Sequence, residues 1–222
     1  MIITLSGKAH SGKSEVAQVL IKPFSFVEHT LAYTLKRMCE AVFFMSEYDT
    51  EDPVGKETLF DKPIQIDADH VIDLLLYLKF QLGLQLTQET KDIIRDSMLA
   101  LPLLVSPRKV LQFIGTEVLR KALGDDVHVD FWERRLKQEP AKDVIVTDVR
   151  FTNEKNHFKN KEALQILVLD GTENEGVVTH KSELCWNKNE FDWVFFNDKR
   201  LGLKALEEQI LSFAKFYVKD RL

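Results

Sequence analysis

The residues with the clearest chemical potential lie close to the N-terminus, in the stretch GKAHSGKS at positions 7–14. This stretch satisfies the spacing GxxxxGK[ST], which is typical of loops that bind phosphate groups. Its glycines let the chain curl until several backbone N–H groups converge on one point, and a helix that begins there adds its positive N-terminal dipole. An apolar run at 2–5 precedes the stretch, as a buried strand would. This order of strand, loop and helix disfavours the alternative, which is an ordinary glycine-rich turn.

The side chains of this loop have separate predicted roles around a nucleoside triphosphate. The ammonium of Lys13 would reach the β- and γ-phosphates, and the hydroxyl of Ser14 would be a ligand of Mg²⁺. We therefore expect ATP and Mg²⁺ as cofactors. The residues expected to contact the nucleotide are Gly7, Ser11, Gly12, Lys13, Ser14 and Glu15.

A second candidate group follows the apolar run VIVT at 144–147. Asp148 would stand at the carboxyl end of this predicted strand, where open α/β sheets gather their ligand contacts. Its carboxylate could orient Mg²⁺ through water, and Arg150 could face the phosphate that is transferred. The alternative is that Asp148 caps the helix that follows, because Asp is a common N-cap residue. The two roles are compatible in one residue.

The elements that must position these residues alternate between strand and helix. Strands are predicted at 2–5, 24–27, 144–148, 164–170 and 193–196, and helices at 12–21, 31–45, 67–82, 87–101, 106–124 and 203–218. We expect Pro23 to end the first helix and the segment 47–65 to be irregular. The alternation indicates an α/β fold in three layers with a parallel sheet of about five strands. It would be a single domain over 1–222, with a helical insertion at 47–140.

Composition limits the class of protein further. The 222 residues are 45% apolar, carry a net charge of −5 and include only two cysteines, Cys39 and Cys185. The net charge disfavours a nucleic acid polymer as a partner, and the cysteines have no metal-site or disulfide spacing. The longest apolar stretches are shorter than the roughly 20 residues that span a bilayer. We expect a cytoplasmic protein without a membrane partner, and the sequence is compatible with a homodimer.

Further blocks along the chain carry a resemblance to a known family. They are LAYTLK at 31–36, SPRKVLQFIGTEVLRKALGDD at 106–126, VIVTDVRFTNE at 144–154 and THKSE at 179–183. Together with the phosphate loop, they resemble the bacteriophage-type deoxynucleoside monophosphate kinases, which are P-loop kinases. The resemblance implies transfer of the γ-phosphoryl group of ATP to a deoxynucleoside 5′-monophosphate (dNMP). It also implies a helical acceptor-binding region and a closing segment at about 171–190, and a host cytoplasm if the chain is phage-encoded.

The resemblance also assigns roles to individual residues. Arg120, Asp148 and Arg150 would join Lys13 in catalysis, and Asp148 would share the metal with Ser14. Trp132 would stack on the base. The residues implied in acceptor binding are Lys36, Arg108, Gln112, Thr116, Arg120, Trp132, Arg150, His180 and Glu183.

The chain departs from the family pattern at three places. Ser14 stands where the family often has an acid directly after the loop lysine, and Glu15 follows it. The block LAYTLK lacks the usual proline and acid, and THKSE has a lysine where proline is frequent. These departures concern metal ligation and acceptor choice more than the phosphoryl chemistry.

Each assignment has an alternative. The arginines could cover a helix face or pair with Glu117, Asp125 and Asp126, Trp132 could be a core residue, and His180 a surface residue. At the level of the whole protein, the DVR block and the FDWV segment also resemble animal-type phosphomevalonate kinases. A phosphate loop alone also fits a non-catalytic nucleotide-binding switch. The block LQFIGTE favours a nucleotide acceptor, and the lack of an NKxD-like signature disfavours a guanine-nucleotide switch.

Overall fold

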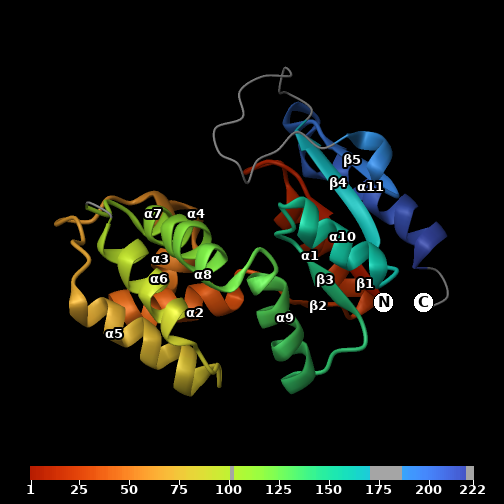
Figure 1. The fold of residues 1–222 in the computed structure, drawn as a ribbon. Helices are drawn as coiled ribbons and strands as arrows, with labels where there is room; N and C mark the ends of the chain where they lie inside the picture. The colour runs from red at the N-terminus through yellow and green to blue at the C-terminus, as the bar shows by residue number, and fades with distance from the viewer. Residues whose placement is uncertain (101–102, 171–186, 219–222) are drawn as a thin grey trace. The chain divides into compact units, whose positions relative to one another are not determined.

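The computed structural model describes residues 1–100, 103–170 and 187–218. The chain divides into two compact units, and Figure 1 colours the ribbon by position along the chain. One unit, called the sheet unit, comprises Met1–Leu31 and Trp132–Leu222. The other, called the helical unit, comprises Ala32–Phe131. In the chain, the helical unit is therefore an insertion between two segments of the sheet unit.

A five-stranded sheet forms the centre of the sheet unit (Figure 1). Its strands lie in the order β2-β3-β1-β4-β5, and every neighbouring pair is parallel. The predicted α/β fold with about five parallel strands is confirmed. In the central strand, Ile3 lies opposite Ile145 on one side and Leu164 on the other. The strands are β1 (Ile2–Ser6), β2 (Val27–Glu28), β3 (Val144–Val146), β4 (Leu164–Asp170) and β5 (Trp193–Asn197).

Helices and strand residues enclose the core of the sheet unit. Ile3 and Leu5 of β1, with Ile166 and Val168 of β4, belong to one buried cluster with residues of α1 and α11. The residue between the first two, Thr4, is buried on the opposite face, as in a parallel sheet covered on both sides. The helices are α1 (Lys13–Phe24), α9 (Val127–Gln138), which belongs to this unit from Trp132 on, α10 (Thr152–Asn160) and α11 (Gly202–Tyr217), with the short η4 (Lys188–Glu190) and η5 (Lys199–Leu201).

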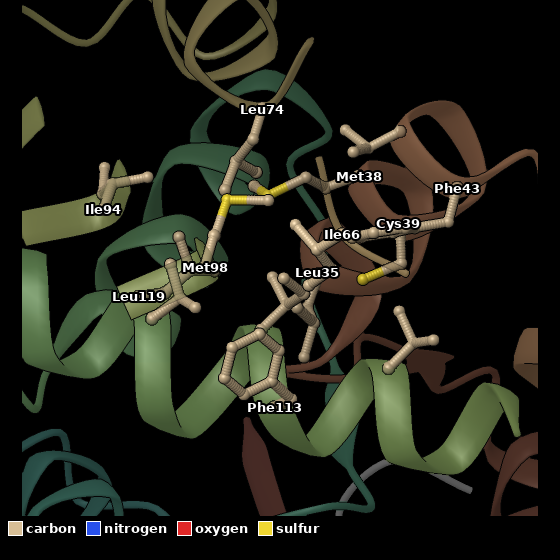
Figure 2. Close-up of a cluster of buried hydrophobic side chains, with 14 of the residues drawn as sticks. Leu35, Met38, Cys39, Phe43, Ile66, Leu74, Ile94, Met98, Phe113 and Leu119 are labelled. Carbon is tan, nitrogen blue, oxygen red and sulfur yellow. The ribbon is translucent and has the colours of Figure 1, made fainter. Parts of the chain in front are cut away.

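The helical unit has a hydrophobic core of its own. Figure 2 shows side chains from separate helices meeting there, among them Met38, Leu74, Met98 and Phe113. No described helix of the chain is long and apolar enough to cross a membrane. The elements of the helical unit are α2 (Tyr33–Phe43), α3 (Glu47–Glu51), α4 (Pro53–Glu57), α5 (Ala68–Leu76), η1 (Tyr77–Gln81), α6 (Gln88–Leu99), α7 (Pro107–Gln112), η2 (Phe113–Arg120) and α8 (Lys121–Leu123).

The prediction of an irregular segment at 47–65 was wrong for its first half. Two short helices, α3 and α4, lie there because each has a strong N-cap. The side chain of Ser46 accepts a hydrogen bond from the Asp49 N–H, and that of Asp52 accepts from two N–H groups of α4. Pro53 occupies the first turn of α4, where its missing N–H removes no helical hydrogen bond.

Further boundaries differ from the predictions. Helix α1 includes Pro23 and ends at Phe24, and Ser25 then adopts a left-handed φ of 58°. Strand β2 therefore begins at Val27 instead of at 24. The helical unit contains α2 and ends at Phe131, so it starts and ends earlier than the insertion expected at 47–140.

The core of the helical unit gives a stability test on helix α5. Leu74 is fully buried, whereas Ile72 on the same helix is 52% exposed. We expect Leu74→Ala to lower the free energy of unfolding by about 2–5 kcal/mol, because lost transfer free energy and the remaining cavity add. Ile72→Ala should change it by about 0.5 kcal/mol or less. Urea unfolding followed by circular dichroism measures both, and equal effects would contradict the assigned core face.

Candidate functional site

The predicted phosphate loop connects the central strand to the first helix. Strand β1 ends at Ser6 and α1 begins at Lys13. Three residues of the connection have a positive φ, namely Gly7 at 148°, His10 at 61° and Gly12 at 102°. Such left-handed residues turn successive peptide N–H groups toward a common side, which is the arrangement of an anion-binding nest.

Gly7 and Gly12 have no room for a side chain, in addition to their positive φ angles. A Cβ atom on Gly7 would collide with the carbonyl oxygen of Val168 in β4. A Cβ atom on Gly12 would collide with the side-chain amide of Asn197 at the end of β5. Asn197 also donates a hydrogen bond of 3.1 Å to the carbonyl oxygen of Ser11. The loop is therefore pressed against two neighbouring strands.

The ammonium of Lys13 lies across the loop. Its Nζ donates to the carbonyl oxygens of Gly7, at 2.9 Å, and Lys8, at 2.6 Å. Phosphate oxygens, which carry full negative charge, would compete effectively with these neutral acceptors. Lys13 is thus held at the loop, where the predicted triphosphate would bind.

Two buried hydroxyls support the fit of a phosphate tail. Ser6 and Ser11 are each 1% exposed, and neither Oγ has a hydrogen-bond partner among the described residues. A Cβ on Gly7 would lie 2.8 Å from the Ser11 Oγ, so this hydroxyl faces across the loop. Buried polar groups without a partner are uncommon in proteins. Hydroxyls, backbone N–H groups and the Lys13 ammonium are all donors, and such a set fits the phosphates of ATP.

Asp148 joins the ends of two neighbouring strands. It follows β3, and its Oδ1 accepts a hydrogen bond of 2.8 Å from the backbone N–H of Leu31, which follows β2. The alternative in which Asp148 caps helix α10 was wrong, because the N-cap is Phe151 and the Glu154 carboxylate accepts from the N–H groups of Arg150 and Phe151. The carboxylate of Asp148 therefore lies at the carboxyl edge of the sheet, as predicted for a metal-orienting acid.

The remaining candidates of the sheet unit, Ser14, Glu15 and Arg150, are accessible to solvent. Ser14 and Glu15 are exposed in the first turn of α1. Arg150 is also exposed, and its guanidinium forms no ion pair with the described residues. No cluster of three or more His, Cys, Asp or Glu that could hold a metal is found among the described residues.

Four of the expected acceptor residues recur every four residues along one continuous helix. Arg108 and Gln112 lie in α7, and Thr116 and Arg120 lie in η2, which is a π-helix. One turn takes about 3.6 residues in an α-helix and more than four in a π-helix, whose hydrogen bonds join residues five apart. Four residues are slightly more than one turn of α7 and slightly less than one turn of η2. Successive side chains of this set are therefore rotated about the helix axis in one direction along α7 and in the opposite direction along η2. The π-helix thus keeps the four side chains closer to one row than an unbroken α-helix would.

The two arginines of this row have partners within the helical unit. Arg108 forms an ion pair with Glu57 of α4. Arg120 is 7% exposed, and its Nη1 donates to the carbonyl oxygen of Asp125 at 2.7 Å, with the carboxylate of Asp125 at 4.0 Å. For Arg120, the structure shows the pairing with Asp125 that the alternative interpretation named. For Arg108, the partner is a residue that the sequence did not indicate.

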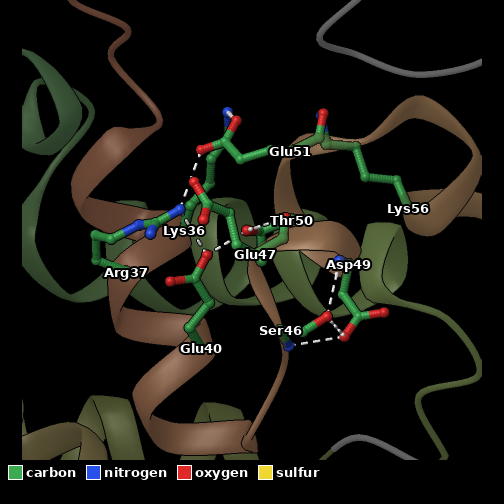
Figure 3. Close-up of polar contacts among 9 residues, drawn as sticks. All are labelled: Lys36, Arg37, Glu40, Ser46, Glu47, Asp49, Thr50, Glu51 and Lys56. Atoms are coloured by element: carbon green, nitrogen blue, oxygen red, sulfur yellow. Dashed lines mark hydrogen bonds and ion pairs between the residues drawn. The ribbon is translucent and has the colours of Figure 1, made fainter.

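Lys36 belongs to a network of charged side chains between α2 and α3 (Figure 3). Its Nζ lies 2.5 Å from a carboxylate oxygen of Glu51. Arg37 pairs with Glu40 at 2.7 Å and with Glu51 at 3.2 Å, and Thr50 donates to Glu40. Lys36 and Arg37 are therefore both paired with carboxylates.

Trp132 lies in the core of the sheet unit. It is 1% exposed, its ring packs edge to face on Phe158 at 5.0 Å, and its indole N–H donates to the His29 carbonyl oxygen at 3.1 Å. The buried ring has no free face, so the structure agrees with the core alternative instead of the stacking role. The ring of His29 is buried as well, and burial, followed by the charge of Arg135, lowers its pKa.

Two expected acceptor residues, His180 and Glu183, lie outside the described residues, as does most of the expected closing segment. Sequence reasoning also missed one contact, that of Asn197 with the phosphate loop. The available signal was the position of Asn197 at the end of a predicted parallel strand, because such ends meet at one edge of the sheet.

The comparisons with known proteins agree with this geometry. Residues 1–210 match the model of the family described as deoxynucleotide monophosphate kinase. The chain belongs to this family. A protein of Acanthamoeba polyphaga mimivirus, whose name assigns it to the deoxynucleotide monophosphate kinases, is 26% identical over 227 residues, covering 96% of this chain and 95% of its own length. The deoxynucleoside-5′-monophosphate kinase of Escherichia phage T5 is 42% identical over 74 residues, covering 32% of this chain and 26% of its own.

Family membership confirms the predicted resemblance and decides between the candidate activities. The protein is a kinase of deoxynucleoside monophosphates, and kinases of this family use ATP as the phosphoryl donor. The phosphomevalonate kinase and nucleotide-switch alternatives are set aside. The donor-rich loop at the carboxyl edge of the sheet is the part of the structure that suits this chemistry.

The position of Lys13 leads to a direct test. We expect Lys13→Ala to lower kcat/KM by about 100-fold or more, because a positioned cation at the β- and γ-phosphates is lost. Lys22→Ala, at the exposed far end of the same helix, is the matched control and should retain full activity. A coupled assay for ADP release measures both variants, and circular dichroism checks their folding. Retention of full turnover in a folded Lys13→Ala enzyme would contradict the assignment.

Proposed function

We propose that the loop of the sheet unit binds the triphosphate of Mg-ATP and that cations of the helical unit bind the phosphate of the dNMP acceptor. The proposal rests mainly on the loop, where backbone N–H groups, the Lys13 ammonium and two unpartnered buried hydroxyls form a set of donors. Phosphoryl transfer requires little covalent work from the protein and depends on positioned positive charge. A loop of this kind would supply positive charge around the triphosphate of ATP, the phosphoryl donor.

On the donor side, the proposed roles follow from position. Lys13 would stabilise the negative charge that develops between the β- and γ-phosphates. The Ser14 hydroxyl would ligate Mg²⁺, and Asp148 would orient the metal from the end of β3, directly or through water. Arg150 is exposed after the same strand and would contact the phosphoryl group during transfer, since a guanidinium grips two oxygens at once.

On the acceptor side, the phosphate of the dNMP would replace carboxylates as the partner of the cations that bind it. Lys36 and Arg108 already pair with the carboxylates of Glu51 and Glu57. An incoming phosphate must therefore displace or share these carboxylates. Gln112 and Thr116, in the same row as Arg108 and Arg120, would offer hydrogen bonds to the rest of the nucleotide. The protein would work in the cytoplasm, where both nucleotides occur, as a monomer or homodimer.

A substrate panel tests the proposed reaction. Each of the four common dNMPs is incubated with the protein, ATP and Mg²⁺, and the products are separated by anion-exchange chromatography. We expect equal amounts of ADP and a deoxynucleoside diphosphate with at least one acceptor, and loss of turnover when EDTA removes the metal. ADP released at the same rate without any monophosphate would contradict the proposal, because it indicates hydrolysis.

The pairing of Arg108 offers a second test, specific to the acceptor site. Glu57→Gln keeps the side-chain shape but removes the charge that competes with the acceptor phosphate. Because a partly exposed ion pair contributes at most about 1 kcal/mol, we expect the KM for the dNMP to fall about two- to fivefold, with the KM for ATP unchanged. Steady-state kinetics with each substrate varied measures both constants.

The matched control is Glu139→Gln in the sheet unit, where Glu139 pairs with Arg135 at 3.0 Å. It should leave both KM values unchanged. An unchanged or raised KM for the dNMP in Glu57→Gln would show that Arg108 does not receive the acceptor phosphate.

A further inference from the structure

Asn197 connects the last strand of the sheet to the phosphate loop. It is the final residue of β5 and is 6% exposed. Its side-chain Nδ2 donates to the carbonyl oxygen of Ser11 at 3.1 Å, in a buried hydrogen bond. The same amide fills the space beside Gly12 that a Cβ atom would need. Asn197 therefore contacts both residues of the peptide that joins Ser11 to Gly12.

This contact fixes the direction of one loop peptide. The structure contains no cis peptide bond in its described part, so the carbonyl of Ser11 and the N–H of Gly12 point in opposite directions. Because the carbonyl is held toward Asn197, the N–H points away from β5. No hydrogen bond of the Gly12 N–H to a protein acceptor is found among the described residues. A rotated peptide would instead present a carbonyl oxygen on the side of this N–H, where it would repel a phosphate.

Hydrogen bonds from helix α11 hold the backbone next to Asn197. The side chain of Gln209 in α11 accepts from the N–H of Phe196 at 3.2 Å and donates to its carbonyl oxygen at 3.0 Å. These two bonds tie the end of β5 to α11. An amide is the suitable side chain at Asn197, because an ionised carboxylate of the same shape has no hydrogen to donate.

We propose that Asn197 is a positioning residue for ATP, which holds the peptide between Ser11 and Gly12 with its N–H available to the triphosphate. It acts through the loop backbone and touches no reacting atom. The inference rests on the proposed function of the loop. It adds a residue from the opposite end of the chain to the donor site.

Binding measurements on the full chain test this role. Dissociation constants for ATP and for inorganic tripolyphosphate are measured by calorimetry for the wild type, Asn197→Ala and Asn197→Asp. We expect Asn197→Ala to raise both constants about tenfold, which corresponds to one buried hydrogen bond. Asn197→Asp should raise them further, because its carboxylate also repels phosphate. The constant for a dNMP that the wild type phosphorylates should stay unchanged.

Gln165→Ala is the matched control, since it removes a buried amide hydrogen bond to a backbone carbonyl, that of Lys155, near the start of β4. It should change the constants for ATP and tripolyphosphate less than twofold. Wild-type affinity in both Asn197 variants overturns the proposal, and so does a loss limited to ATP, because Asn197 would then recognise the nucleoside. An equal loss of dNMP affinity would show a general structural role and also overturns it.

Two further outcomes complete the test. If Asn197→Ala does not fold, the nearly isosteric Asn197→Asp decides, and if neither variant folds, the side chain is structural and the proposal fails. Lys13→Ala separates this inference from the function on which it rests. Unchanged ATP binding in Lys13→Ala would refute the loop as the ATP site. Weakened binding there, with wild-type binding in the Asn197 variants, would refute only the role of Asn197.

Discussion

The close approach of the phosphate loop to its neighbouring strands is the constraint on which the rest of the site depends. The backbone at Gly7 and Gly12 has left-handed torsions and leaves no room for a side chain against Val168 and Asn197. This approach is possible because β4 and then β5 follow β1 in the order of the sheet. Parallel strands all end at the same edge, so Asp148 and Asn197 come to the edge that carries the loop from distant parts of the sequence.

Charge is organised differently in the two units. In the sheet unit, the loop brings together several donors, which are backbone N–H groups, the buried hydroxyls of Ser6 and Ser11 and the ammonium of Lys13. In the helical unit, Lys36, Arg108 and Arg120 are held by carboxylate or carbonyl oxygens. Cations without such partners would attract polyanions of many kinds. The pairing therefore acts in the same direction as the net charge of −5, which also disfavours non-specific binding of polyanions. Under the proposed function, an acceptor phosphate would have to bind these cations better than the protein's own oxygens do, and this requirement would favour specificity over affinity.

The parts of the site that the sequence predicted are those encoded by neighbouring residues. The loop motif, β1 and the position of Asp148 follow from short apolar runs and their flanking residues. The contact between Asn197 and Ser11 spans 186 residues, and no local pattern encodes it. Trp132 could not be placed from sequence because an aromatic residue on a helix looks the same whether it faces a core or a ligand.

The π-helix η2 was not predicted, although the spacing of apolar residues in the sequence indicates it. Val110, Ile114, Val118 and Ala122 recur every four residues, which is a longer period than the 3.6 of an α-helix. Over a few turns this small excess is hard to separate from the normal scatter of an α-helical pattern. The structure shows its cause, since η2 covers Phe113–Arg120.

The hydrogen bonds at the boundaries of the helical unit have an evolutionary consequence. The chain leaves the sheet unit at Leu31, whose N–H binds Asp148, and returns at Trp132, whose indole binds the carbonyl of His29. The residues at which the inserted segment leaves and re-enters the sheet unit are therefore both held by hydrogen bonds to the backbone after β2, at Leu31 and at His29. An inserted segment attached in this way can lengthen, shorten or change its sequence while the frame that carries it keeps its own core. A lineage could thus remodel the insertion while the sheet unit is inherited intact.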